Sequence, residues 1–137
     1  MKRLICTLLL IGLLAAATGA LAEARMTEAI MIYEDYDGQR CEQTVVDSDT
    51  LQELQDMLVR AKKNKAELEN CTMNCTLFCR FGEEKLYDFA IATDGCPYMT
   101  DLSSNRTYRF TDADHERLWE IFDLVQETMG YDASMVF

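Results

Sequence analysis

The chain has 137 residues, of which 24 are acidic and 13 basic, so its formal net charge at pH 7 is −11. The acidic residues are spread along the chain rather than collected in a tail, which indicates a well-solvated surface. Nucleic acids and anionic membranes are bound through clustered Lys and Arg, so the charge excludes both classes of binding protein.

The first 22 residues have the three parts of a secretory signal peptide. A Lys-Arg pair at positions 2 and 3 precedes an apolar run over residues 4–17, and an A-x-A motif follows at positions 20–22. The apolar run is short for a spanning helix, so we expect cleavage after Ala22 and no membrane span in the mature chain. The location is then secreted or cell-envelope, and residues 23–137 form one domain.

Two extended runs flank Asp37-Gly38 in the stretch AIMIYEDYDGQRCEQTVV, residues 29–46. Asp-Gly favours the type I′ turn because both central residues need positive φ, so the stretch predicts a β-hairpin. A calcium-binding loop would place Asp35 and Asp37 at ligand positions. Tyr33 and Thr44 would then stand where carboxylates are required, so we prefer the hairpin and predict no metal.

An amphipathic helix is predicted for the stretch DSDTLQELQDMLVRAKKNK. Asp49 is the expected N-cap with Gln52 three residues later, and lysines at the end of the stretch suit the helix C-terminus. Apolar side chains recur at helical spacing, which defines a buried face. The face consists of Leu51, Leu54, Leu58 and Ala61.

Alternating apolar residues from 75 to 91 predict a second hairpin, turning at residues 83–85. The register that brings its two apolar faces together pairs Phe81 with Tyr87, Cys79 with Phe89 and Leu77 with Ile91. A short extended piece and a polar turn at residues 103–105 come next, and then a strand near residues 106–110.

The last element is a helix that begins after the N-cap Thr111, has acidic residues in its first turn and ends at Gly130. Its apolar face is formed by Leu118, Ile121, Phe122, Val125 and Met129. The element order is therefore ββαβββα. This order predicts an α+β domain in which two helices cover one face of an antiparallel sheet of about five strands.

Four features of the sequence together resemble a known group of domains. They are the D-G hairpin, the D-x-x-x-L-x-x-L-x-x-x-L helix, the run into IATDGCPYM and the closing TDADHERLWEIF. They are similar to small secreted or lipoprotein-attached domains of unknown function from Gram-positive bacteria. The resemblance covers most of the mature chain and implies a fold rather than an activity.

Five cysteines remain after cleavage, namely Cys41, Cys71, Cys75, Cys79 and Cys96. In an exported protein disulfides are expected, and an odd number leaves at least one thiol free or paired between chains. The predicted register brings either Cys71 or Cys75 near Cys96, and we favour Cys71. Cys41 is then available to pair with Cys75 or Cys79, whereas Cys79 also fits as a small apolar core residue.

Metal and redox chemistry fit these cysteines poorly. The spacing C-x-x-x-C-x-x-x-C differs from the close pairs of zinc sites, and the single histidine, His115, lies in another element. A thioredoxin-like site needs C-x-x-C, which is absent. We therefore predict no metal and no cofactor. The N-x-T triplets at Asn70, Asn74 and Asn105 are read as unmodified polar turns, because the Ala-rich signal peptide is of a bacterial type.

The sequence contains no catalytic signature, which favours a non-catalytic, exported binding or interaction domain that meets another extracellular or envelope protein. Exposed aromatic residues are frequent interface hot spots, so Trp119, Tyr98 and Tyr108 are the candidate contact residues. His115 is expected to be a solvated helix residue. Two alternatives stay open: a small hydrolase that uses His115 with nearby carboxylates, and a thiol-reactive protein that uses an unpaired cysteine.

Overall fold

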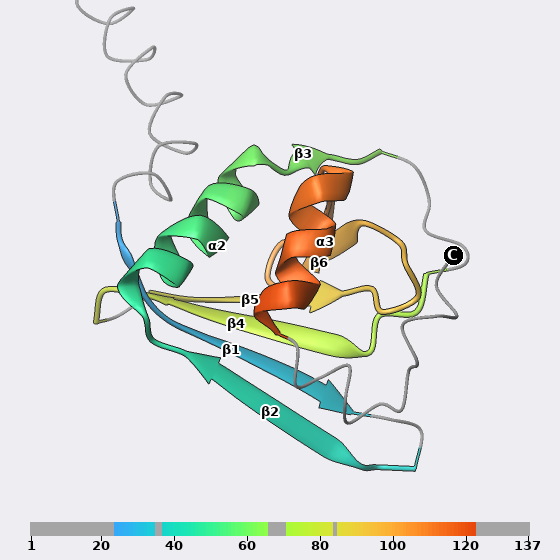
Figure 1. Ribbon diagram of the computed structural model, residues 1–137. Coiled ribbons are helices and arrows are strands. Elements are labelled where there is room, and N and C mark those ends of the chain that lie inside the picture. Colours follow the sequence, from blue (N-terminus) through green and yellow to red (C-terminus); the bar gives the residue numbers. More distant parts are fainter. Residues whose placement is uncertain (1–23, 35–36, 66–70, 84, 123–137) are drawn as a thin grey trace, which may run out of the picture.

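The computed structural model describes residues 24–34, 37–65, 71–83 and 85–122 (Figure 1). The predicted signal peptide and the predicted continuation of the last helix to Gly130 lie outside these residues. Within them, no helix is both long enough and apolar enough to cross a membrane.

The described residues form seven strands and two helices. In chain order they are β1 (Met26–Glu34), β2 (Arg40–Val45), α2 (Ser48–Arg60), β3 (Lys62–Lys63), β4 (Cys75–Phe81), β5 (Lys85–Ile91), β6 (Tyr98–Asp101), β7 (Arg106–Arg109) and α3 (Asp112–Ile121).

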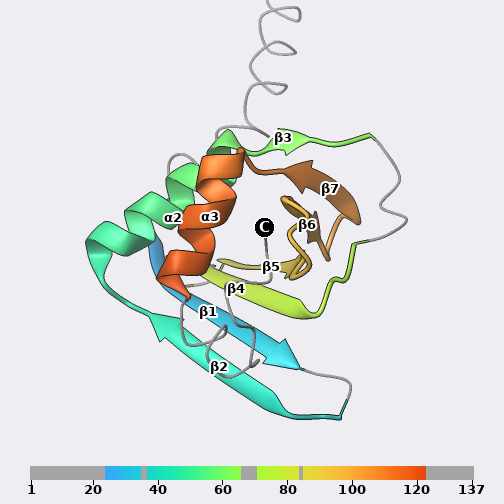
Figure 2. The ribbon, with the colours of Figure 1, turned by 45° about the vertical axis from the view of Figure 1, so that its right-hand side comes forward.

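All seven strands belong to one antiparallel sheet with the order β2-β1-β4-β5-β6-β7-β3. Both helices lie on the same side of this sheet (Figure 1). The sheet curves, so that β7 and β3 come round toward the helices (Figure 2). The predicted α+β class with an antiparallel sheet and two helices is confirmed.

The predicted number of strands was wrong, because β3 and β6 were missed. β3 consists of Lys62 and Lys63 only, so it has no apolar alternation that a pattern could detect. It pairs with β7 because α2 ends beside that strand. β6 has four residues and was read as a short extended piece, yet it is hydrogen-bonded to strands on both sides.

Both predicted hairpins exist, but their turns differ from the prediction. Pairing of β1 with β2 ends at Glu34 and Arg40, so the connection has five residues instead of the two of a type I′ turn. In the second hairpin Phe81 pairs with Lys85 and Cys79 with Tyr87, a register shifted by two residues. The chain already turns at Gly82, which adopts a φ of 62°. A shift of two preserves which side chains face the core.

Each helix begins with a side-chain cap. The N-cap of α2 is Asp47 rather than the predicted Asp49, because its carboxylate accepts hydrogen bonds from the N–H and the hydroxyl of Thr50, at 3.0 and 2.8 Å. These bonds lower the pKa of Asp47. The predicted cap of α3 is confirmed: Thr111 Oγ1 accepts a hydrogen bond from the N–H of Asp114 at 3.1 Å.

The hydrophobic core lies between the helices and the inner face of the sheet. Strand alternation directs every second side chain of β1 and β4 to this face, including Met31 and Leu77, which are fully buried. The helices contribute Leu54 and Leu118. Burial of these apolar side chains is the principal stabilising contribution, about 1.5–3 kcal/mol for each large side chain.

Two arginines join the helices to each other at their surface. Arg60 of α2 donates two hydrogen bonds to the Asp114 carboxylate, at 3.1 and 2.7 Å, and Arg117 of α3 donates two to Glu53, at 2.7 and 3.1 Å. The Arg60 pair lowers the pKa of Asp114, whose side chain is only 11% exposed. Bidentate geometry of this kind fixes the relative position of the helices.

Candidate functional site

A disulfide joins the segment before β4 to the loop between β5 and β6. It links Cys71 and Cys96, whose Cα atoms are 6.0 Å apart, and it confirms the predicted pairing of these two cysteines. The β4–β5 ladder ends with Cys75 paired to Ile91, and extending its register by four residues places Cys71 opposite residue 95. The bridge therefore closes the open end of the hairpin.

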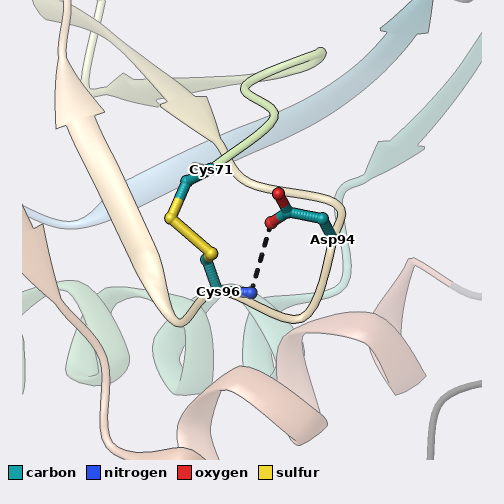
Figure 3. A group of neighbouring side chains, drawn as sticks. All are labelled: Cys71, Asp94 and Cys96. Carbon is teal, nitrogen blue, oxygen red and sulfur yellow. Dashed lines mark hydrogen bonds between the residues drawn. A yellow bond between two sulfur atoms is a disulfide. The ribbon is translucent and has the colours of Figure 1, made fainter. Parts of the chain in front are cut away.

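Asp94 holds the same two segments together through hydrogen bonds, and Figure 3 shows the one that it makes beside the disulfide, to Cys96. Its carboxylate accepts from the N–H of Thr72 at 2.6 Å and from the N–H of Cys96 at 3.4 Å. Thr93 adds a backbone hydrogen bond to Thr72 at 3.0 Å and a side-chain hydrogen bond to Asn74. Asp94 was missed in the sequence analysis, although an Asp two residues before a cysteine in a D-G-C turn is a typical Asx-turn signal.

Cys71, Asp94 and Cys96 place their ligand atoms within 4.8 Å of one another, the kind of grouping that can hold a metal ion. In the disulfide the two sulfur atoms are bonded to each other, so neither is the thiolate that a soft metal ion requires. Only Asp94 then offers a ligand atom that is not tied up in the disulfide. With the bridge formed, the group is a structural clamp rather than a metal centre.

The other three cysteines among the described residues are free thiols, so the expected second bridge from Cys41 to Cys75 or Cys79 is wrong. Cys41 and Cys75 both pair with Tyr33, from opposite sides of β1. Their Cα atoms are thus separated by two strand spacings, about 9.6 Å, beyond the range of a disulfide. Cys75 and Cys79 are buried, and desolvation raises the pKa of each thiol to about 12.

His115 is buried, contrary to the expectation of a solvated residue. Its Nε2 accepts a hydrogen bond from the indole N–H of Trp119 at 3.1 Å, and the ring lies near the backbone of Ala92. Phe110 stacks on it at 6.4 Å between ring centroids. Burial lowers the pKa of His115 because the charged form loses solvation. The imidazole therefore packs between α3 and the loop that contains Ala92.

The three predicted contact aromatics do not form one surface. Tyr108 pairs with the buried Met99, so it lies on the core side of the sheet, where it packs against the core. Tyr98, the neighbour of Met99, points to the opposite face. Trp119 lies on α3, with its indole directed at His115. All three are half-buried.

Comparisons with known proteins found no matching family model, no matching curated protein and no matching solved structure. The resemblance to small exported Gram-positive domains stays a prediction. The functional interpretation therefore depends on the geometry of this chain.

Neither helix covers the outer face of the sheet (Figure 1). We define the open face as the outward-pointing residues of β1, β4, β5 and β6. They alternate with core residues along each strand and form three rows across the sheet. The first row contains Glu28, Arg80 and Leu86, the second Ile30, Phe78 and Asp88, and the third Ile32, Thr76, Ala90 and Thr100.

Ion pairs and hydroxyl groups lie around the apolar residues of the open face. Arg80 donates to Glu28 at 3.1 Å on one side, and Thr100 and Thr107 share a hydrogen bond of 3.2 Å at the other end. Ile30, Ile32 and Phe78 are only half-buried. The open face could have been found in the sequence, because these apolar residues occupy the positions that a two-residue alternation assigns to solvent.

Proposed function

We propose that the protein is an exported, non-catalytic binding domain that uses the open face to bind another extracytoplasmic protein. The observation that carries this proposal is the apolar centre of the open face, formed by Ile30, Ile32 and Phe78 on adjacent strands. The Cys71–Cys96 bridge suits an oxidising compartment, in agreement with the predicted signal peptide.

The open face has the composition of a protein–protein interface. Such interfaces have a centre depleted of charge and a polar, solvated rim. Here Ile30, Ile32 and Phe78 form the centre together with the small side chains of Thr76 and Ala90. The charged groups around it are Asp88, which pairs with Phe78, and the Glu28–Arg80 ion pair. The sheet makes this surface continuous and rigid, so little conformational entropy is lost on binding.

The charge of the chain indicates the chemistry of the partner. A protein of net charge −11 attracts a basic protein over distances of about one Debye length, roughly 8–10 Å at physiological salt. We therefore propose a partner with an apolar centre and a basic rim. The association rate would fall as the ionic strength rises, whereas the dissociation rate would depend mainly on the apolar contacts.

The environment of His115 favours binding over hydrolysis. A general base needs a ring nitrogen within hydrogen-bond reach of the proton that it removes. Nε2 of His115 accepts from Trp119, and the residue is 8% exposed. Use of Nε2 as a base would require this hydrogen bond to break and the ring to become accessible to a substrate.

The proposal is tested with Phe78→Lys, which places a charge at the apolar centre. Val59→Lys is the matched control, because Val59 is 53% exposed on α2, which packs on the other side of the sheet. Each protein is immobilised and exposed to extracytoplasmic extract, and captured proteins are identified and then titrated individually. Circular dichroism verifies that both variants fold.

We expect a basic protein that binds the wild type and Val59→Lys alike, with affinity for Phe78→Lys lower by tenfold or more, about 1.4 kcal/mol. Equal binding by all three proteins would show that the open face is not the binding surface. Capture of no protein, together with turnover of any substrate by the purified chain, would refute the non-catalytic assignment.

A further inference from the structure

The two edges of the sheet differ in how well they are protected against pairing with another strand. Edge strands offer unpaired backbone N–H and C=O groups, and proteins protect them by shortening the strand or by adding lysine, proline or a bulge. The β3 edge has two residues, both lysines. The β2 edge has six residues, pairs with β1 without any register shift, and contains neither lysine nor proline.

The hydrogen-bond pattern shows which residues of β2 direct their backbone groups to the open edge. The N–H of Glu34 donates to Asn74, so the backbone groups of Glu34 point toward β4. The preceding residue, Tyr33, therefore points toward β2, and its partner Cys41 points back toward β1. The N–H and C=O groups of Arg40 and Glu42 accordingly face outward.

We propose that a second copy of the chain pairs antiparallel along β2, about a two-fold axis at Cys41, so that the two sheets become continuous. This register places Arg40 of each copy opposite Glu42 of the other. Within one chain these two side chains form an ion pair at 3.3 Å, so the dimer adds to that pair two contacts of opposite charge between the copies. An axis at Glu42 would instead oppose two glutamates, and an axis at Gln43 would leave both charged residues opposite uncharged ones. The charge pattern thus selects one register.

The same register brings the two Cys41 residues together. Because Cys41 directs its backbone groups toward β1, the Cys41 pair is of the non-hydrogen-bonded kind, with Cα atoms about 4.5 Å apart and side chains close together. That separation lies within the range of a disulfide. Among the free thiols Cys41 is half-buried, whereas Cys75 and Cys79 are buried.

The disulfide compensates for the small size of the interface. With the axis at Cys41, only Arg40, Cys41 and Glu42 of each β2 pair with their counterparts, which buries far less area than the roughly 1,200 Å² of a standard stable interface, so the uncrosslinked dimer is weak. With a small-molecule disulfide as oxidant, the two thiols lose two protons and two electrons and form one S–S bond. The oxidant is reduced to two thiols. The product is a covalent dimer with both pairs of helices on the same side of the joined sheet.

The test is disulfide exchange with oxidised glutathione, followed by non-reducing electrophoresis and peptide mapping. Wild type is compared with Arg40→Glu, with Glu42→Arg and with the exchanged double variant Arg40→Glu/Glu42→Arg. Cys41→Ser is the control for the position of the bridge. Circular dichroism melting shows whether each variant is folded, and the wild type is also examined by sedimentation equilibrium under reducing conditions.

We expect a dimer bridged through Cys41, formation about fivefold slower or more in each single reversal, and recovery of the wild-type rate in the double variant. Three outcomes would overturn the proposal: no Cys41-linked dimer, a bridge through other cysteines, or single reversals that form dimer as fast as wild type. A dimer that appears only after removal of residues 123–137 would overturn it for the full chain and identify that segment as the occupant of the edge.

Discussion

Removing the Cys71–Cys96 bridge tests most directly how the fold is held together. The bridge closes a loop with a sequence separation of 25 residues. The loop-closure relation, −2.1 − 1.5R ln n in cal/mol/K, gives about 3.5 kcal/mol at 25 °C for a loop of this length. We therefore expect Cys71→Ser/Cys96→Ser to lower the free energy of unfolding by about 3 kcal/mol, since the Asp94 hydrogen bonds hold the same two segments in the native state.

The assay is urea unfolding followed by circular dichroism, with Cys41→Ser as the control that removes a sulfur without removing a bridge. The double variant should also show a larger m-value, because its unfolded chain lacks the cross-link and exposes more surface. Reduction of the wild type should reproduce the loss. A decrease below about 1 kcal/mol, or an equal decrease in Cys41→Ser, would refute the loop-closure argument.

Three further predictions concern other contacts. Burial holds the pKa of His115 below its ordinary value of 6.5, so the unfolded chain takes up a proton first as the pH falls. The contribution of His115 to the free energy of unfolding is then fully present above about pH 6.5 and is lost as the solution is acidified. The urea midpoint measured against pH should therefore depend less on pH in His115→Gln than in the wild type. Arg60→Ala leaves the Asp114 carboxylate without its bidentate partner and should lower the free energy of unfolding in urea by about 1–2 kcal/mol. The control Lys62→Ala should lower it by less than about 0.5 kcal/mol, and equal losses in the two variants would show that the ion pair is not stabilising. Gly95 adopts a φ of 82°, and a Cβ atom added there would have open space around it. Gly95→Ala should therefore lower the free energy of unfolding by about 1–2 kcal/mol through backbone strain alone, and a thermal midpoint equal to that of the wild type would contradict this.

The local patterns of the sequence predicted those features that depend on near neighbours. Alternation located β4 and β5, helical spacing located α2, and Thr111 was correctly assigned as a cap, because each depends on residues within a few positions. The Cys71–Cys96 pairing was also predicted. The register error of two residues did not disturb it, since either register places Cys71 within one residue of Cys96.

The tertiary structure decided whatever depends on elements that meet from distant parts of the chain. Cys41 was expected to pair with Cys75 or Cys79, but β1 lies between β2 and β4, and sequence spacing contains no information on which strands become neighbours. His115 was expected in water, but the packing of α3 against the loop at Ala92 buries it.

The sequence by itself determined the α+β class, the position of the longer elements, the disulfide and the acidic surface, because periodicity and charge are local properties. Only the tertiary structure decided the strand order, the open face and the exposed β2 edge. The physical reason is that burial and strand pairing are set by contacts between segments far apart in sequence, and those contacts exist only once the sheet has formed.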